Sequence, residues 1–261
     1  MQVNKTKTKL QAGELVFGLV VTSPDPNMVD LAGVAGMDFV RIDCQHGAHT
    51  LETVEHMARA AEAGGVTPLA RIPNNSAEVI VRHLDRGLAG LIFPRIATVD
   101  EARAVVRHTK FAPLGERTYT ARGGLVRWTA GVKDDNEHEF ANRETLVICL
   151  AEDAEGYRNI EKIAEVPGVD MIMVGHGDLA QSMGHLRTAE GPEVRKVVDD
   201  GIRRVRKVGK PVGLTIGSGA DVARQQELIG MGVQMFNIVQ GPMIVRSMRD
   251  IAAKVRQMKK S

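Results

Sequence analysis

Two carboxylates each follow a short apolar segment near the middle of the chain. Residues 147–151 end at Glu152, and residues 171–174 are followed closely by Asp178. A helical segment separates the two apolar segments, so they predict neighbouring parallel strands whose carboxyl ends share one edge of a sheet. Oxygen ligands at that edge suit a hard divalent cation. The alternative is that both acids only cap the following helices, because acidic side chains favour the positive end of a helix dipole.

Other polar residues fall at the ends of expected strands. His46 follows the second expected strand, and Arg71 ends the third. A lone histidine is usually structural or solvated, and a lone arginine usually belongs to an ion pair. Together with Glu152 and Asp178, however, they would supply a base, a fixed cation and two metal ligands on one rim. Asp85 ends the helix before the fourth strand, so this argument does not place it at the rim.

Apolar segments alternate with helical segments about eight times along the chain. This alternation favours a (β/α)8 barrel over an open doubly wound sheet. The expected strands are residues 14–21, 37–42, 67–71, 88–93, 144–151, 169–174, 212–216 and 234–239. The expected helices are residues 27–35, 51–63, 75–84, 98–108, 159–166, 193–208, 220–231 and 243–258. No G-x-G-x-x-G fingerprint follows a strand, so a dinucleotide cofactor is not expected.

The domain organisation follows from the same pattern. We expect a single barrel domain over residues 13–261, preceded by an exposed N-terminal arm at residues 1–12. Periodicity weakens at about residues 111–140, where prolines, glycines and an acidic cluster occur. A stretch of this length inside a compact domain predicts a functional or disordered loop.

Composition narrows the class of protein. The chain has 261 residues, 43% of them hydrophobic, and a net charge of +2, so no nucleic-acid partner is expected. The first residues lack the apolar core of a secretory signal, and no apolar run approaches the ~18 residues of a membrane span. Two cysteines do not make a disulfide framework. We therefore expect a soluble, cytoplasmic protein with no membrane partner.

Four motifs in order carry a resemblance to a known family. Residues 43–47 read D-C-Q-H-G against D-x-E-H-G, and residues 70–73 read A-R-I-P against V-R-x-P. Residues 84–94 follow L-D-x-G-A-x-G-I-x-x-P, and residues 168–184 follow G-V-D-x-x-x-x-G-P-x-D-L-x-x-S-x-G. From about residue 14 to 255 the chain resembles the HpcH/HpaI aldolase family. These are class II, metal-dependent pyruvate aldolases on a phosphoenolpyruvate/pyruvate-type barrel, such as 2-dehydro-3-deoxyglucarate and 4-hydroxy-2-oxoheptanedioate aldolases.

The resemblance implies a role for each matching residue. Glu152 and Asp178 would bind Mg2+, Mn2+ or Co2+, and backbone amides near Gly177 and Asp178 would hold the carboxylate of the substrate. Arg71 would face the keto oxygen and stabilise an enolate. His46, paired with Asp85, would act as the general base.

The resemblance also implies an activity and an assembly. We expect reversible cleavage of 4-hydroxy-2-oxo acids to pyruvate or hydroxypyruvate plus an aldehyde, through a metal-stabilised enolate. The alternatives are an oxaloacetate decarboxylase, an acyl-CoA lyase that uses the same enolate chemistry, and an inactive metal-binding barrel. We also expect a homo-oligomer, with dimers assembled into a hexamer, in which the closing helix packs on a neighbour.

Several positions depart from the family pattern. Gln45 replaces the glutamate before the base, Leu150 replaces a glutamine two residues before Glu152, and His176 replaces a proline beside Asp178. These changes leave the metal ligands, the arginine and the base in place. They leave the natural aldehyde and the preferred metal open.

Overall fold

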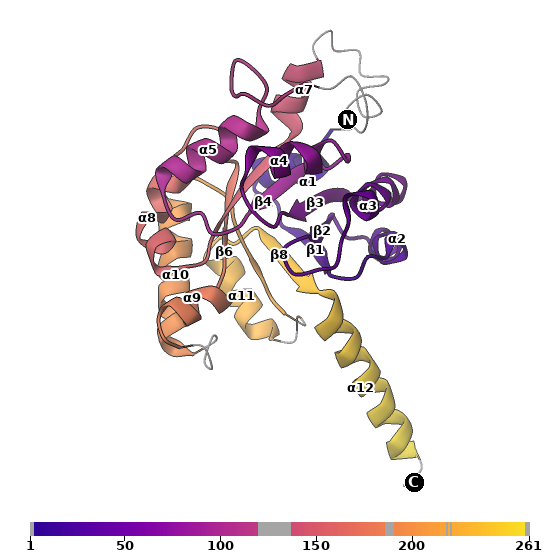
Figure 1. The fold of residues 1–261 in the computed structure, drawn as a ribbon. Coiled ribbons are helices and arrows are strands. Elements are labelled where there is room, and N and C mark those ends of the chain that lie inside the picture. The colour runs from indigo at the N-terminus through magenta and orange to yellow at the C-terminus, as the bar shows by residue number, and fades with distance from the viewer. Residues whose placement is uncertain (1–2, 120–136, 186–190, 218, 220, 259–261) are drawn as a thin grey trace.

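The strands form a closed barrel. The computed structural model describes residues 3–119, 137–185, 191–217, 219 and 221–258. All neighbouring strands are parallel and follow sequence order, with β8 closing on β1 (Figure 1). The strands are β1 Val16–Val21, β2 Phe39–Asp43, β3 Thr67–Arg71, β4 Gly90–Phe93, β5 Leu146–Ala151, β6 Met171–Val174, β7 Val212–Thr215 and β8 Met235–Val239. The expected (β/α)8 barrel is confirmed.

Helices connect and surround the strands. They are α1 Lys5–Gln11, α2 Pro26–Val34, α3 Leu51–Gly64, α4 Ala77–Leu84, α5 Val99–Thr109, α7 Glu137–Glu144, α8 Ala154–Ala164, α9 Gly177–Ser182, α10 Pro192–Lys207, α11 Val222–Gly230 and α12 Gln240–Met258. A capping box between Thr98 and Glu101 opens α5. Ser76, not Asn75, caps α4, because the Asn75 side chain donates instead to the carbonyl of Pro94 at 2.8 Å.

Two apolar layers hold the barrel together. The inner layer fills the barrel with Leu10, Val16, Phe39, Leu69, Ile92, Leu146, Ile148, Leu150, Met171, Met173 and Met235. The outer layer lies between the strands and the helices, where strand residues such as Ile42, Leu91 and Ile172 pack against helix residues such as Met57 and Ile160. The strands are therefore buried on both faces, as parallel strands usually are.

The N-terminal segment is not the exposed arm that its polar sequence predicts. Within it, α1 crosses the N-terminal end of the barrel, and Leu10 enters the inner apolar layer. The Asn4 side chain donates to the carbonyls of Ala89 and Glu144, both at 3.0 Å, and Lys7 pairs with Asp170 at 2.8 Å. The prediction was wrong because these polar groups are buried with partners distant in sequence.

The long loop expected at about residues 111–140 falls mostly outside the described residues. Residues 120–136 are among those not described, and the segment after them begins a helix that we did not expect, α7. Phe140 and Ala141 of α7 pack with Ala89 and Phe111 in a small separate cluster.

The last helix leaves the barrel. α12 follows β8 directly and points away from the other elements (Figure 1). Only Gln240 of its residues is buried, whereas Met248, Ile251 and Val255 are 58–64% exposed. No helix of the described residues, α12 included, combines the length and apolarity of a membrane span.

Candidate active site

A hollow of about 220 Å³ opens at the carboxyl ends of the strands. The residues that line it come from or follow β2, β3, β5, β6 and β7, namely Arg41, Arg71, Leu150, Glu152, Met173, Val174, Gly175, His176, Gly177, Asp178 and Thr215. The structure thus brings Arg71, Glu152 and Asp178 to one place, although they lie far apart in sequence. The active sites of such barrels lie at this end.

Glu152 is fixed and nearly enclosed. It is 4% exposed, and its Oε1 accepts a hydrogen bond from the backbone N–H of Arg95 at 3.0 Å. Arg95 adopts a φ of 54°, in the left-handed region. A β-carbon at Gly175 would lie 2.7 Å from the β-carbon of Glu152, so the glycine leaves room for the carboxylate. Burial, and then the negative charge of Asp178, raise the pKa of Glu152 to about 7.

The capping alternative does not hold for Glu152. The next residue, Asp153, caps α8 by accepting a hydrogen bond from the backbone N–H of Gly156 at 2.7 Å. Asp178, by contrast, does lie in the first turn of α9. Glu152 is therefore buried beside another carboxylate without a capping role.

The two carboxylates suit a divalent cation. A cation between them would remove the repulsion that raises the pKa of Glu152. Within the described parts of the chain, no three or more histidine, cysteine or acidic residues form a metal-binding cluster. Two protein carboxylates leave several positions to water and substrate, which is how Mg2+ is commonly held.

Arg71 is held rigidly beside the carboxylates. Its Nε donates to Asp43 Oδ1 at 3.0 Å and its Nη2 to Oδ2 at 2.5 Å. Burial alone would raise the pKa of Asp43, but the hydrogen bonds and charge of Arg71 lower it. A bidentate pair of this kind fixes the plane of the guanidinium. Arg71 therefore presents a charge of defined orientation to the hollow.

His46 and Asp85 do not meet within the chain. His46 is exposed in the turn after β2, with its backbone N–H 3.3 Å from Asp43 Oδ1. Asp85 caps the C-terminus of α4, and helices of such a barrel run opposite to the strands, so Asp85 lies at the other end. There it accepts a hydrogen bond from buried Arg117 at 2.9 Å. The predicted His46–Asp85 pair is not formed within one chain.

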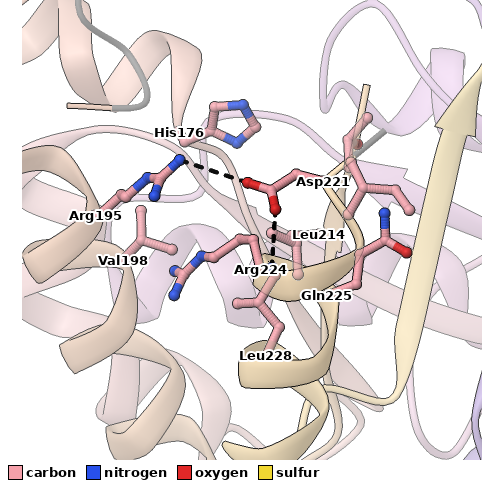
Figure 2. A pocket seen from close by; sticks show the side chains of 10 residues that line it. His176, Arg195, Val198, Leu214, Asp221, Arg224, Gln225 and Leu228 are labelled. Carbon is pink, nitrogen blue, oxygen red and sulfur yellow. Dashed lines mark hydrogen bonds and ion pairs between the residues drawn. The ribbon is translucent and has the colours of Figure 1, made fainter. Parts of the chain in front are cut away.

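A second pocket lies behind β7, between α10 and α11, and shares His176 with the hollow (Figure 2). Val198, Leu214 and Leu228 give it apolar walls. Its arginines are paired: Arg195 lies 3.9 Å from Asp221, and Arg224 contacts Asp199 and Glu227. Its charges are thus largely balanced within the protein.

Sequence comparison assigns the family. The profile described as HpcH/HpaI aldolase/citrate lyase matches residues 16–238. The chain belongs to this family. A 2-keto-3-deoxy-L-rhamnonate aldolase of Escherichia coli O17:K52:H18 is 30% identical over 223 residues, which cover 85% of this chain and 82% of the relative.

Solved structures agree with this assignment. An HpcH/HpaI aldolase/citrate lyase family protein from Burkholderia cenocepacia J2315 is 29% identical, with a TM-score of 0.87 over 97% of this chain and 99% of that one. The citrate synthase SbnG is also 29% identical, with a TM-score of 0.85 over 98% of each chain. The expected family is confirmed, and this HpcH/HpaI protein is a lyase of the aldolase type that acts on small molecules.

Two further polar residues of this HpcH/HpaI site, one lining the hollow and one behind Arg71, had no assigned role in the sequence analysis. Asp43 opens the D-C-Q-H-G motif, so the signal was present, but its contact with Arg71 joins two different strands. Arg41 lies two residues earlier on β2 and therefore on the same face of the strand. Its burial inside the barrel gave no signal in the sequence.

Proposed function

We propose that this protein is a class II aldolase that cleaves 4-hydroxy-2-oxo acids to pyruvate or hydroxypyruvate and an aldehyde. The observation that carries the proposal is the pair of carboxylates that line the hollow, buried Glu152 and exposed Asp178, beside the fixed guanidinium of Arg71. Cleavage of a carbon–carbon bond next to a carbonyl leaves an enolate, whose negative charge needs positive groups nearby.

Each group of residues at the hollow has a separate role in the proposed reaction. Glu152 and Asp178 would hold Mg2+, Mn2+ or Co2+, which as a Lewis acid would polarise the keto group. Backbone N–H groups at Gly177 and Asp178 would orient the substrate carboxylate. Arg71 donates a hydrogen bond to the keto oxygen as negative charge develops there, and Asp43 keeps Arg71 from turning away.

A Schiff-base mechanism has no candidate among the described residues of the hollow. None of those that line it is a lysine. The pKa of Lys110 is lowered to about 8, mainly by burial and then by the charge of Lys7, but its amine donates to the carbonyls of Asn142 and Thr145. Thr145 precedes β5, so Lys110 lies at the opposite end of the barrel.

His46 is the proposed general base. It would take the proton of the substrate hydroxyl at the mouth of the hollow, directly or through water. A base of this kind contributes about 10²–10⁴-fold to a rate. Because Asp85 of the same chain cannot orient it, Asp85 could take part only from a second subunit.

Replacement of His46 by alanine tests this function. We expect His46→Ala to lose about 10²–10⁴-fold in aldol cleavage, while exchange of the pyruvate methyl protons in D2O remains measurable, because Arg71, Glu152 and Asp178 are untouched. Proton NMR of pyruvate and a cleavage assay give the two readouts. His56→Ala, on the exposed surface of α3, is the control. Unchanged cleavage in His46→Ala would move the base to His49 or His176.

The same enolate chemistry leaves a second candidate reaction. The similarity to a citrate synthase structure favours a carbon–carbon lyase that uses oxaloacetate or an acyl-CoA in place of an aldol. Mass spectrometry of products from pyruvate with an aldehyde panel, and from oxaloacetate with and without acetyl-CoA, separates the two.

We further propose a homo-oligomer, expected to be a hexamer, in which α12 packs on a neighbouring subunit. The exposed apolar residues Met248, Ile251 and Val255 recur at helical spacing on α12. Packing against a second copy would bury this stripe, which no described segment of the chain covers.

Light scattering tests this assembly. We expect a mass several times that of the chain at micromolar concentration, and a smaller mass for the variant Met248→Glu with Ile251→Glu, because charges in the interface oppose its burial. Arg249→Glu changes the charge of α12 outside the stripe and serves as the control. A monomeric mass for the unmodified protein contradicts the proposal.

A further inference from the structure

Arg41 is a cation inside the barrel. Its side chain projects from β2 into the hollow and is 5% exposed. Nη1 contacts the sulfur of Met173 at 3.4 Å and the hydroxyl of Thr215 at 3.2 Å. Burial, and then the positive charge of Arg71, lower the pKa of Arg41 to about 10, so the guanidinium stays charged at neutral pH.

No acid of the described residues forms an ion pair with Arg41. The nearest acid along β2 is Asp43, whose two oxygens already accept hydrogen bonds from Arg71. The buried Nε of Arg41 has no hydrogen-bond partner among the described residues. A buried charge without such a partner destabilises a fold, so a group of this kind usually belongs to a binding function.

A second buried polar side chain near Thr215 also lacks a hydrogen-bond partner for one of its atoms. Asn237 of β8 is fully buried and pairs in register with Thr215 of β7. Its Nδ2 donates to the carbonyl of Leu214, but its buried Oδ1 has no partner within the described chain. Leu150, on another wall of the hollow, is apolar where the family pattern has glutamine. Arg41 and Asn237 thus both neighbour Thr215, and each has a buried polar atom without a partner among the described residues.

A 2-oxo acid with a single carboxylate does not need Arg41. Under the proposed function, Arg71 and the metal ion held by Glu152 and Asp178 already bind its keto oxygen, and backbone N–H groups at Gly177 and Asp178 already bind its carboxylate. Arg41 is an additional positive charge, one strand layer deeper than Asp43. The aldehyde enters from the open mouth, so a group that reaches Arg41 must belong to the donor half of the substrate.

We infer that Arg41 is a specificity-determining residue, which binds a second acidic group on the donor 2-oxo acid. Besides pyruvate or hydroxypyruvate, the donors therefore include 2-oxo dicarboxylates, whose second carboxylate accepts hydrogen bonds from the guanidinium of Arg41. This inference rests on the proposed function for the position of the first carboxylate and the keto group.

Matched pairs of acids test the inference in the Mg2+-loaded protein. Oxaloacetate is compared with 2-oxobutanoate, and 2-oxoglutarate with 2-oxopentanoate, by calorimetry and by thermal shift. Charge-assisted hydrogen bonds contribute about 1.5–3 kcal/mol, so we expect the diacid of at least one pair to bind about 10- to 100-fold more tightly than its monoacid. Equal binding within both pairs overturns the inference without any variant.

Variants then assign the preference to one side chain. Arg41→Met keeps a long side chain without charge and should remove the preference for the diacid, while Arg41→Lys should keep part of it. Arg103→Met, an exposed residue of α5, removes one positive charge far from the hollow and should change nothing. If Arg41→Met weakens both acids of a pair equally, or keeps the preference, Arg41 does not recognise the second carboxylate.

The outcome is separable from that of the aldolase proposal. A preference for the diacid without aldol cleavage or proton exchange would support the role of Arg41 and contradict the aldolase function. Aldol cleavage without a preference for the diacid would support the aldolase function and contradict the role of Arg41.

Discussion

Replacement of Glu152 by glutamine is expected to remove divalent-metal binding and aldol cleavage together. The hollow offers only Glu152 and Asp178 as carboxylate ligands among the described residues that line it. An amide keeps the shape of the side chain but not the charge, and a Lewis acid supplies several kcal/mol, so activity should fall at least about 10³-fold. Metal content and cleavage rate are measured in the same samples. Asp178→Asn should behave alike, and Glu155→Gln in the exposed first turn of α8 is the control.

The pH dependence of metal binding tests the same assignment. Burial and the charge of Asp178 raise the pKa of Glu152 to about 7 in the metal-free protein. A metal ligand must be deprotonated, so protons compete with the metal below this pKa. Affinity should be flat above about pH 8 and fall about tenfold per unit well below pH 7. Metal binding that is independent of pH across this window, or full activity in exhaustively chelated enzyme, contradicts the metal site.

Replacement of Arg71 by alanine should reduce turnover about 10²–10³-fold while the metal stays bound. The guanidinium donates to an oxygen that becomes negative only as the carbon–carbon bond breaks, and a donor of this kind contributes that much to kcat. Metal content and kcat are the two readouts. Arg71→Lys should regain only a small part of the kcat that Arg71→Ala loses, because an ammonium cannot reproduce the bidentate contact with Asp43.

Asp43 supplies the matched test of orientation. Asp43→Asn keeps the side-chain volume but weakens the pair that fixes Arg71, so we expect a smaller loss of kcat than in Arg71→Ala, again with normal metal content. Loss of metal in Arg71→Ala would show that the arginine supports the metal site and not the enolate. If Arg71→Ala turns over substrate as fast as the unmodified enzyme, Arg71 has no part in the chemistry.

The sequence by itself determined the barrel and the positions of the two carboxylates that we propose as metal ligands. The eight strands were recognisable because each is a short apolar segment followed by a helical one, and both patterns are local. Glu152 and Asp178 could be placed on one rim because the last residue of a parallel strand always lies at the same end of the barrel. The same logic placed Arg71 on that rim.

Only the tertiary structure decided which polar residues are buried and with which partners. The polar residues of α1 close the barrel because their partners, such as Glu144 and Asp170, come from distant segments. Asp85 pairs with Arg117 because α4 carries it to the end opposite His46. Arg41 has no ion-pair partner in the described parts of the chain, because the acid next to it on β2, Asp43, is already bound to Arg71. Composition and periodicity report how often a residue type is buried, whereas these contacts depend on how separate strands and helices meet in space.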